Sequence, residues 1–328
     1  MDEIFIGSLG GTIAMTRQDG GGAQPRLTAQ GLLASVPGLP AGLKVQAHSV
    51  LQVASPSISL PDMLAVLDWC NACQQQGARA IILTQGTDTL EETSCLLDLF
   101  WPHDVPLILT GAMRLPDSAG ADGPANLRAA IEVAQDPGSR GRGVLVVVNE
   151  TVHAARRVHK SDSLAVQTFT SGSAGPLGRL CEGEVIWFAP ATRRPALPPP
   201  RRSDHEVALV MMGLGIGPGQ LRHALTSPDY AAVVLSALGA GHVPAALAGV
   251  VSEGPPGRPL IFCTRCDDGP TTRATYGYPG SEIDLQQRGA WPGGWLSAAK
   301  ARILIWAILA TGATGDQARQ LFDARSRP

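Results

Sequence analysis

Short apolar runs alternate with amphipathic segments through the first half of the chain. The apolar runs lie at residues 4–6, 45–53, 80–83, 106–109 and 144–148. Between them, apolar side chains recur at helical spacing at residues 28–36, 61–76, 90–100 and 123–134. Continuous apolar strands that alternate with helices are typical of a parallel sheet covered by helices on both faces. The pattern therefore predicts an α/β fold with a doubly wound, largely parallel sheet.

This alternation is interrupted at residues 189–206, which are rich in proline and arginine and are not expected to form a core element. Beyond them it resumes. Strands are predicted at residues 207–211, 233–236 and 260–263, and helices at residues 220–225, 244–251, 296–309 and 314–322. We therefore expect a large N-terminal α/β catalytic domain over residues 1–188, a linker over 189–206 and a smaller C-terminal α/β domain over 207–328.

The composition is that of a folded protein. Of the 328 residues, 44% are hydrophobic and 16% are charged, which is too apolar and too weakly charged for a disordered chain. The 26 basic and 28 acidic residues give a formal net charge of −2, so we expect no nucleic-acid partner. Lys44, Lys160 and Lys300 are the only lysines, and a lysine at a special position would therefore stand out.

Hydropathy gives no sign of a membrane protein. The N-terminus begins Met1-Asp2-Glu3, is acidic and lacks the basic region of a signal peptide. The most apolar later stretch, residues 231–251, is interrupted by Gly239 and Gly241 and does not suit a membrane span. We expect a cytoplasmic protein with no membrane association.

Four of the six cysteines form two C-x-x-C pairs, a spacing that also occurs in zinc sites: Cys70 with Cys73, and Cys263 with Cys266. About 190 residues separate the pairs, whereas the ligand pairs of a structural zinc site are usually close in sequence. The first pair also lies in an amphipathic helical pattern. We favour buried, reduced thiols and expect neither a metal nor a cofactor.

A glycine-rich segment, Gly7-Ser8-Leu9-Gly10-Gly11-Thr12, follows the first apolar run. Open parallel sheets bind ligands at the carboxyl ends of their strands. Glycines there let the backbone approach a ligand and leave N–H groups for a carboxylate or an oxyanion. Thr12 then lies where a nucleophile is useful, although the Gly-Gly-Thr pattern alone is more typical of an ordinary turn.

A second polar segment, residues 84–93, follows the apolar run at residues 80–83. Thr89 and Glu92 have the spacing of a capping box for the next helix. Thr87 and Asp88 are not needed for that cap, and a hydroxyl beside a carboxylate suits the orientation of an amine and a water. Lys160 is the third feature: an isolated lysine is usually solvated, but one buried beside a hydroxyl can act as a base.

Together these segments resemble the bacterial-type L-asparaginase family over most of the chain. The resemblance is carried, in the family's order, by Gly10-Gly11-Thr12-Ile13-Ala14, residues 85–93, Gly111-Ala112-Met113-Arg114, residues 121–127 and residues 143–147, with support from Pro176-Leu177-Gly178 and Lys300-Ala301-Arg302. One such motif would be weak, but the ordered set is specific.

The resemblance implies hydrolysis of the side-chain amide of L-asparagine to L-aspartate and ammonia, with no metal or cofactor. Thr12 matches the family's threonine nucleophile, and Thr87, Asp88 and Lys160 match its second catalytic triad. The resemblance also implies a homotetramer built as a dimer of dimers.

Substrate-binding residues are implied in the same way. Ser55 matches the residue that holds the α-carboxylate of the substrate, and Asp88 also matches the group that receives its α-ammonium. Gly11 and Ala112 lie in segments whose N–H groups suit a tetrahedral oxyanion. Glu282 matches the acid that a neighbouring subunit lends to the site, although on sequence alone it is expected to be a solvated surface carboxylate.

The chain departs from the family in the loop after Thr12. The family usually has a tyrosine there, which relays the proton of the nucleophile, but residues 15–25 contain none. We hypothesise that Tyr276 or Tyr278 of a neighbouring subunit supplies the phenol. Simple packing of both tyrosines at a subunit interface is an equally good interpretation. Three glycines at residues 20–22 indicate that the loop is a mobile lid.

Two further departures concern substrate contacts. Pro56 stands where many periplasmic relatives have a glutamine, and Ala240 replaces an asparagine that those relatives use from the partner subunit. We therefore expect weaker binding and low activity on glutamine. His242 lies near the second position, where a structural histidine is the simpler interpretation.

Two alternative functions remain open. The chain is either a hydrolase of the same family that acts on another small β-amide, or an amino-acid-binding relative without turnover. The complete set of Thr12, Thr87, Asp88 and Lys160 disfavours the second, because a binding protein has no use for the lysine. A dinucleotide site at residues 213–219 is also disfavoured, because Pro218 occupies the place of the third glycine in that fingerprint.

Overall fold

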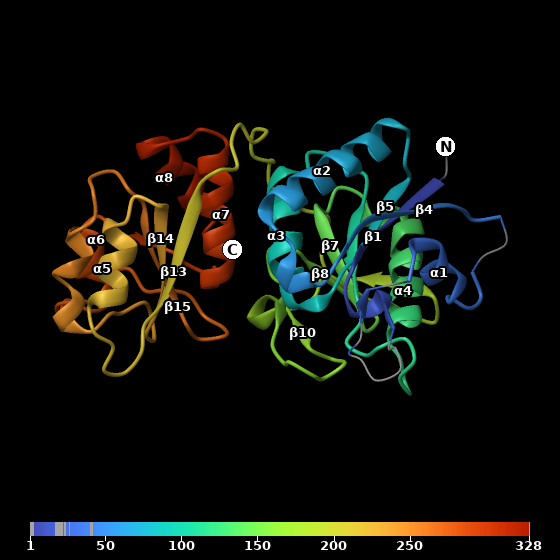
Figure 1. Cartoon of the computed structure of the whole chain (residues 1–328), viewed down its shortest axis with the longest axis horizontal. Coiled ribbons are helices and arrows are strands. Elements are labelled where there is room, and N and C mark those ends of the chain that lie inside the picture. The colour runs from blue at the N-terminus through green and yellow to red at the C-terminus, as the bar shows by residue number, and fades with distance from the viewer. Residues whose placement is uncertain (1–2, 17–21, 23, 26, 40–41, 328) are drawn as a thin grey trace. The chain divides into compact units, whose positions relative to one another are not determined.

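The five apolar runs of the first half form five strands of one eight-stranded sheet in a computed structural model of the protein (Figure 1). The structure describes residues 3–16, 22, 24–25, 27–39 and 42–327. It divides into two compact units, Met1–Ala196 and Leu197–Pro328, and the division falls within residues 189–206. Each unit has a sheet and a hydrophobic core of its own.

Five neighbouring strands of the first sheet run parallel. In spatial order they are β4 (Lys44–Val53), β1 (Glu3–Gly10), β5 (Ala80–Thr84), β6 (Leu107–Thr110) and β7 (Val144–Val148). Three antiparallel strands extend the sheet beyond β7: β8 (Thr151–Ala154), β11 (Gly178–Cys181) and β12 (Glu184–Trp187). Every residue of β5, β6 and β7 is buried, which explains their continuous apolar sequence.

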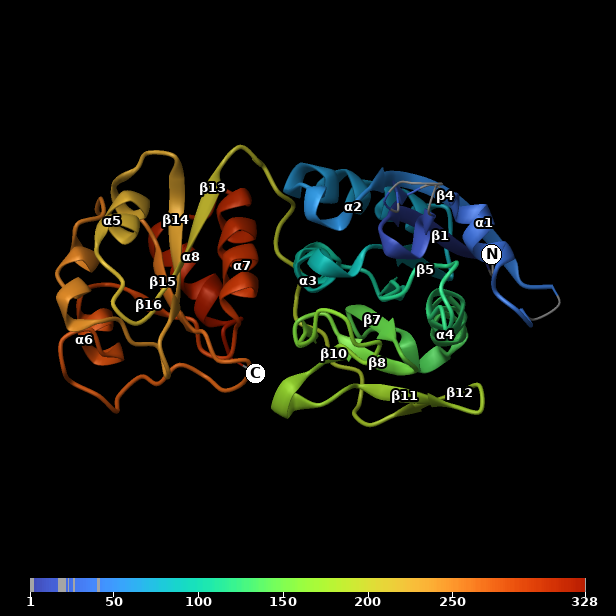
Figure 2. The same ribbon diagram turned by 60° about the horizontal axis from the view of Figure 1, so that its bottom comes forward.

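Helices cover both faces of this sheet (Figure 2). On one face α2 (Leu60–Gln75) packs beside α3 (Leu90–Phe100), and on the other α4 (Gly123–Gln135) packs beside α1 (Ala29–Ala34). Thr28 caps α1, because its hydroxyl accepts the Gly31 N–H at 3.2 Å. The fold class predicted from the sequence is confirmed.

Short elements connect these layers. They are the two-residue strands β2 (Met15–Thr16), β3 (Gln24–Pro25), β9 (His159–Lys160) and β10 (Phe169–Thr170), and the 3-10 turns Thr12–Ala14, Ser55–Ser57, Thr87–Thr89, Pro137–Ser139 and Gly172–Ala174. β2 pairs with β3, and β9 pairs with β10.

The second unit has a four-stranded parallel sheet in the order β13 (Glu206–Met211), β14 (Tyr230–Ala237), β15 (Leu260–Thr264) and β16 (Trp291–Pro292). On one face α7 (Ala298–Ala310) packs against the sheet, and α8 (Gly315–Asp323) packs on α7. On the other side of the unit lie α5 (Gly219–Thr226) and α6 (Glu282–Gln287).

One predicted helix is wrong. Residues 244–251 form two 3-10 turns, Ala245–Leu247 and Val250–Ser252, instead of an α-helix. Their N–H groups bond three residues back, as from Leu247 to Pro244 at 2.8 Å. Leu247, Val250 and Val251 still reach the core. A spacing of three or four residues suits both helix types, so the apolar pattern does not distinguish them over so short a segment.

Candidate active site

The loops that follow β1 and β5 meet backbone to backbone. These two strands are neighbours in the sheet. A Cβ atom on Gly11 would lie 2.0 Å from the nitrogen and 2.1 Å from the Cα atom of Gly86, and Gly11 has a φ angle of 82°. Only glycine fits at such a contact. Thr12 and Thr87 each directly follow one of the two glycines, so the two threonine-bearing turns both start from this contact.

Lys160 joins the hydroxyl and the carboxylate that the sequence singled out. Its Nζ atom donates to Thr87 Oγ1 at 2.9 Å and to Asp88 Oδ1 at 2.7 Å. The Lys160 side chain is only 15% exposed and Thr87 is buried, whereas the Asp88 side chain is 58% exposed. The structure therefore brings Thr87, Asp88 and Lys160 together, with the carboxylate at the open end.

Glu91 fixes the backbone from which Lys160 projects. Its Oε2 atom accepts the Lys160 N–H at 2.7 Å and lies 2.8 Å from His159 Nδ1. Glu91 is buried, and β9 is only two residues long, so its pairing with β10 gives little support of its own. Sequence reasoning missed Glu91 and His159, because nothing in the sequence separates Glu91 from the adjacent Glu92.

Ser55 is buried beside these groups. Its Oγ atom lies 3.4 Å from Asp88 Oδ2, and a Cβ atom on Gly86 would lie 2.7 Å from Ser55 Oγ. The Thr87–Thr89 turn therefore has the Ser55 hydroxyl on one side and the Lys160 ammonium on another. A small substrate that carries a carboxylate and an amine would find hydrogen-bond donors for the carboxylate and the Asp88 carboxylate for the amine.

The capping box predicted for Thr89 and Glu92 is wrong. Thr89 occupies the N-cap position of α3, but its side chain accepts no hydrogen bond from the first turn of that helix. Its hydroxyl donates to the Ser55 carbonyl at 3.0 Å and accepts from Gln85 Nε2 at 3.1 Å. Thr89 thus ties Ser55 to the turn that carries Thr87, which a local capping rule does not anticipate.

Ala112 lies in a loop that packs against the same turn. A Cβ atom on the preceding Gly111 would lie 2.5 Å from the Gln85 carbonyl oxygen and 3.3 Å from Thr87 Cγ2. Ala112 itself is buried. The backbone after β6 is therefore placed against Thr87, where its N–H groups are in reach of a ligand bound at the turn.

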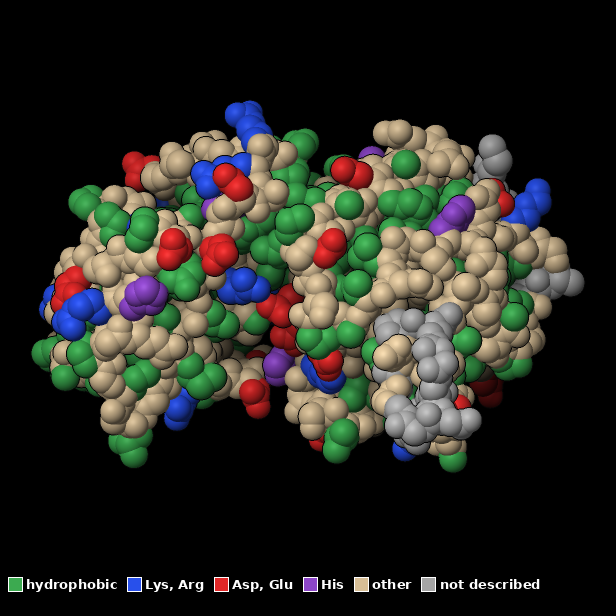
Figure 3. Space-filling view, in the orientation of Figure 1, with side chains coloured by type: hydrophobic (Ala, Val, Ile, Leu, Met, Phe, Trp, Pro, Cys, Tyr) green, Lys and Arg blue, Asp and Glu red, His purple; other side chains and the backbone are tan. Residues whose placement is uncertain are grey.

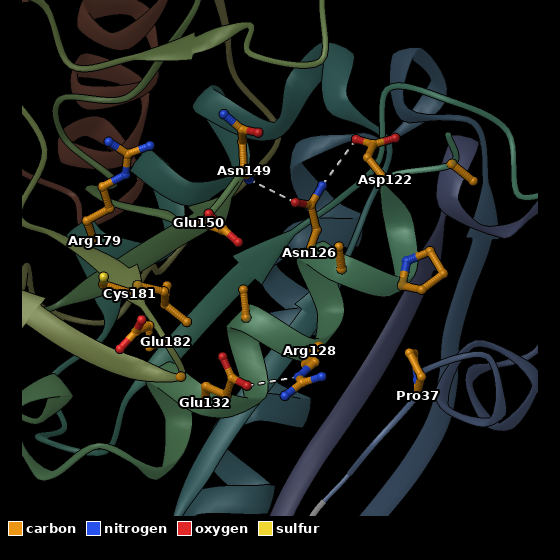
Figure 4. A pocket seen from close by; sticks show the side chains of 16 residues that line it. Pro37, Asp122, Asn126, Arg128, Glu132, Asn149, Glu150, Arg179, Cys181 and Glu182 are labelled. Carbon is orange, nitrogen blue, oxygen red and sulfur yellow. Dashed lines mark hydrogen bonds and ion pairs between the residues drawn. The ribbon is translucent and has the colours of Figure 1, made fainter. Parts of the chain in front are cut away.

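The start of α4 braces that loop (Figure 4). The Asp122 carboxylate accepts the N–H groups of Met113 and Arg114, both at 2.9 Å. The Asn126 amide donates to the Gly111 carbonyl at 2.9 Å and to Asp122 at 3.1 Å. Two buried side chains thus hold residues 111–114 rigidly, which preorganises any N–H donor that the loop presents.

A cavity of about 1100 Å³ lies along α4 and the turn between β11 and β12 (Figure 4). Its lining includes Arg128, Glu132, Arg179 and Glu182, and none of the predicted site residues. The cavity is therefore distinct from the candidate site. Asn126 lines the cavity and also bonds the Gly111 carbonyl in the loop beside the site.

In the second unit, Glu282 is buried, so the expectation of a solvated carboxylate is wrong. Its Oε1 atom accepts the N–H groups of Thr275 at 2.7 Å and Tyr276 at 2.8 Å. Burial alone would raise the pKa of the Glu282 carboxyl, but the backbone donors outweigh it and the pKa is lowered. The chain before α6 folds around this carboxylate and keeps it ionised.

His242 bridges Glu282 and Tyr278. Its Nε2 atom lies 3.1 Å from Glu282 Oε2, and its Nδ1 atom lies 2.8 Å from the Tyr278 hydroxyl. The Tyr276 ring packs edge-on against the imidazole, with 5.0 Å between centroids. Burial, and then the negative charge of Glu282, raise the pKa of Tyr278, which keeps the phenol protonated. His242 and Tyr278 are 36 residues apart, and no sequence signal indicated their contact.

Both units match family models. Residues 3–193 match the model described as "Asparaginase, N-terminal", and residues 206–322 match the "Glutaminase/Asparaginase C-terminal domain". The chain belongs to the asparaginase family. The family resemblance found in the sequence is thereby confirmed.

Relatives within the asparaginase family align along most of the chain. A probable L-asparaginase from Deinococcus radiodurans is 34% identical over 318 residues, which cover 95% of this chain and 94% of that protein. A probable periplasmic L-asparaginase from Haemophilus influenzae is 30% identical over 313 residues, which cover 93% and 88%. The crystal structure of a probable cytoplasmic L-asparaginase from Campylobacter jejuni has a TM-score of 0.85 over 99% of both chains; at 24% identity it supports the fold alone.

The loop that usually carries the family's tyrosine falls mostly outside the described residues. Its ends pair as β2 and β3, and residues 17–21 and 23 are not described. The predicted lid therefore stays a prediction.

The cysteine prediction is partly wrong. Cys70 and Cys73 are buried in α2 and Cys263 is buried in β15, but Cys266 is exposed. Burial raises the pKa of Cys73 to about 11, so its thiol stays protonated. Across the residues that the structure describes, no group of three or more His, Cys, Asp or Glu side chains is placed to bind a metal ion.

The surface of this asparaginase-family chain is mixed in charge. On the face drawn in Figure 3, acidic and basic side chains are interspersed with uncharged surface on each unit. None of the helices in the described ranges is long and apolar enough to cross a bilayer.

Proposed function

We propose that this chain hydrolyses the side-chain amide of L-asparagine to L-aspartate and ammonia. The observation that carries the proposal is the contact of Lys160 Nζ with both Thr87 Oγ1 and Asp88 Oδ1. The turn that holds this pair starts at the backbone contact from which Thr12 also starts. Membership of the asparaginase family supports the substrate, since L-asparaginases are among the relatives.

In the first half-reaction Thr12 is the nucleophile. Its Oγ1 atom forms a bond to the amide carbon while its proton passes to a base, because a neutral hydroxyl is a poor nucleophile. N–H groups at Thr12 and Ala112 stabilise the oxyanion of the tetrahedral intermediate. The intermediate breaks its C–N bond, the nitrogen takes up a proton and ammonia leaves, and an ester to Thr12 remains.

In the second half-reaction a water cleaves that ester. The amine form of Lys160 accepts the Thr87 proton while the Thr87 hydroxyl takes one from the water. The water oxygen bonds to the ester carbon and the bond to Thr12 breaks. The Thr12 oxygen takes up the proton that Lys160 received, which restores the amine. Asp88 stabilises the ammonium that forms on Lys160, and L-aspartate leaves.

Fixed groups hold the two ends of the substrate. We assign the α-carboxylate to Ser55 and the backbone beside Gly11, and the α-ammonium to Asp88 and the partner subunit's Glu282. The amide carbon is then positioned at Thr12, and such orientation accounts for a large part of an enzymatic rate. The assignment of Glu282 requires a homo-oligomer, for which we propose a homotetramer built as a dimer of dimers.

Two departures from the family bear on specificity and on the activation of the nucleophile. The missing polar contacts at Pro56 and Ala240 are consistent with low activity on glutamine. A phenol from Tyr276 or Tyr278 replaces the loop tyrosine in this proposal.

We propose a cytoplasmic location, and fractionation of the native cells with an antibody to the chain tests it.

The proposal is tested by ammonia release from asparagine and from glutamine. We expect the wild type to favour asparagine, and Thr12→Ala and Thr87→Ala each to lower kcat by about 1000-fold or more. Thr226→Ala on α5 is the control and leaves kcat unchanged, since that hydroxyl bonds only within its own helix. A wild type that releases no ammonia from asparagine, or a fully active Thr12→Ala, would overturn the proposal.

Another small β-amide is the second candidate substrate, and the loss of polar contacts at Pro56 and Ala240 favours it. A panel of small amides compared by kcat/KM decides between the two. An amide that is cleaved faster than asparagine and equally needs Thr12 identifies the alternative.

A further inference from the structure

Three hydrogen-bonded side chains lead from the interior of the second unit to its surface. The Glu282 side chain is 0% exposed, the His242 side chain is 16% exposed and Tyr278 is 47% exposed. The carboxylate lies 3.1 Å from the imidazole Nε2, and the imidazole Nδ1 lies 2.8 Å from the phenolic oxygen. Exposure rises in the order of bonding, so the exposed phenol ends a chain that starts at a buried charge.

The direction of each hydrogen bond follows from the charge of Glu282. Its carboxylate already accepts two backbone N–H groups and remains ionised, so it accepts a third hydrogen bond from His242 Nε2. A neutral imidazole with its proton on Nε2 has an unprotonated Nδ1, which is an acceptor. Tyr278 therefore donates its hydroxyl hydrogen to Nδ1, and the lone pairs of its oxygen remain available at the surface.

This arrangement transfers a proton inward when an external hydroxyl contacts the phenol. The external O–H bond breaks and a new O–H bond forms on Tyr278, while the original Tyr278 proton moves to His242 Nδ1. The product is an imidazolium beside the Glu282 carboxylate, which stabilises it as the buried acid does in a carboxylate–histidine–hydroxyl triad. Among the described residues, the titratable side chains in contact with His242 are Glu282 on α6 and the tyrosines of the preceding loop, Tyr276 and Tyr278.

The part of the first unit that the structure describes offers no such base to Thr12. Among the described residues, no side chain or backbone group is hydrogen bonded to the Thr12 hydroxyl, and Lys160 is engaged with Thr87 and Asp88. We propose that Tyr278, held by His242 and Glu282, is the proton relay that activates the threonine nucleophile. This inference rests on the proposed function, in which the partner subunit completes the site.

The geometry separates the two tyrosines that the sequence left as alternatives. Tyr276 contacts the imidazole only through its ring, and its hydroxyl is bonded to no described residue. Tyr276 is 43% exposed, which is close to the exposure of Tyr278. Tyr276→Phe thus removes a hydroxyl from the same loop without interrupting the chain of bonds.

The test compares kcat and KM for asparagine in Tyr278→Phe and Tyr276→Phe. We expect Tyr278→Phe to lose at least about 100-fold in kcat, the usual contribution of a positioned acid or base, with little change in KM. Tyr276→Phe should lose far less. Tyr230→Phe on β14 is the unchanged control. Equal losses at residues 276 and 278, or a wild-type kcat in Tyr278→Phe, would overturn the relay.

His242→Asn adds a readout that a purely structural histidine would not affect. The asparagine amide can donate to Glu282 and accept from Tyr278, but it cannot take up a proton. We expect His242→Asn to lower kcat with little change in KM, because the relayed proton then has no imidazole to receive it. A retained kcat, in a variant with a wild-type melting temperature, would contradict the proposal.

The two proposals fail in different ways. If the wild type releases no ammonia from asparagine, the proposed function is overturned. If the wild type is active and Thr12→Ala is not, but Tyr278→Phe and His242→Asn behave as the wild type, the relay alone is overturned.

Discussion

Gly11 shows how a single residue sets the geometry of the candidate site. Its φ of 82° already favours glycine, and Gly42 has a similar φ of 84°. The two differ in their surroundings, because a Cβ atom on Gly42 would meet nothing within 4 Å, whereas one on Gly11 would overlap the Gly86 backbone. Gly11 thus combines a strained backbone with a steric overlap, whereas Gly42 has the strained backbone alone.

We expect Gly42→Ala to lower the free energy of unfolding by about 1 kcal/mol, the cost of a left-handed conformation for a side-chain-bearing residue. Gly11→Ala should cost at least about 2 kcal/mol more, because the loops after β1 and β5 must move apart. Urea denaturation of the two variants measures the difference. Equal losses would mean that the two backbones are not in contact.

His242 and Glu282 illustrate what single positions hide in a sequence. Glu282 precedes Ile283 in an ordinary polar segment, and only the structure shows that backbone N–H groups surround it. The burial of such a carboxylate depends on the path of a loop, which hydrophobic patterning does not encode. Residue type and motif were enough to single out Thr12, Thr87, Asp88 and Lys160, and the structure brings the last three together.

At the scale of elements, β9 is the weakest support in the candidate site. It has two residues and places Lys160, so its position depends on the side chain of Glu91 in α3. The carboxylate accepts the backbone N–H of Lys160 and also bonds His159. A charge-assisted hydrogen bond of this kind positions a lysine that a two-residue strand would leave loose.

We expect Glu91→Ala to lower kcat for asparagine by about 10- to 100-fold, because a misplaced Lys160 no longer supports Thr87. KM should change much less. The control is Glu132→Ala on α4, which breaks a surface ion pair with Arg128 and leaves kcat unaltered. Glu91 would be only a stabilising residue if its replacement lowered the melting temperature with kcat intact.

The elements that the sequence predicted best are those buried on both faces. β5, β6 and β7 are continuous apolar runs because helices cover each side, and helices α2, α3 and α4 had the matching spacing. The antiparallel strands β8, β11 and β12 were not predicted. Each of them is four residues long. In β11 and β12 every second residue is exposed, so the mixed polarity of these two strands resembles that of a loop.

At the scale of the whole molecule, the candidate groups are divided between the units. Thr12, Thr87 and Lys160 belong to Met1–Ala196, and Glu282 with Tyr278 belongs to Leu197–Pro328. The sequence does not show whether the second unit of a neighbouring copy contributes residues to the site of the first unit. Subunit pairing depends on surface complementarity between distant segments, and neither periodicity nor motifs record it.

Mixed oligomers test whether two subunits build one site. The experiment co-expresses Thr12→Ala subunits with Glu282→Gln subunits, each of which we expect to be inactive alone. If Glu282 acts across the interface, random pairing restores about one quarter of wild-type activity, because half of the symmetric pairs are mixed and each has one intact site. Mixing Thr12→Ala with Thr87→Ala is the control and should restore none, since both residues come from the same unit. No recovery in the first mixture would place Glu282 in its own subunit's site.

The contact of Gly11 with Gly86 also limits how this site can change during evolution. The contact is between main-chain atoms, so no change of side-chain rotamer alters the distance between the two loops that carry the threonines. A longer substrate would require β1 to slide along β5, which would break the pairing of a whole strand at once. New specificities are therefore expected to arise by substitution at peripheral positions such as residue 56, while the spacing between the two loops is inherited unchanged.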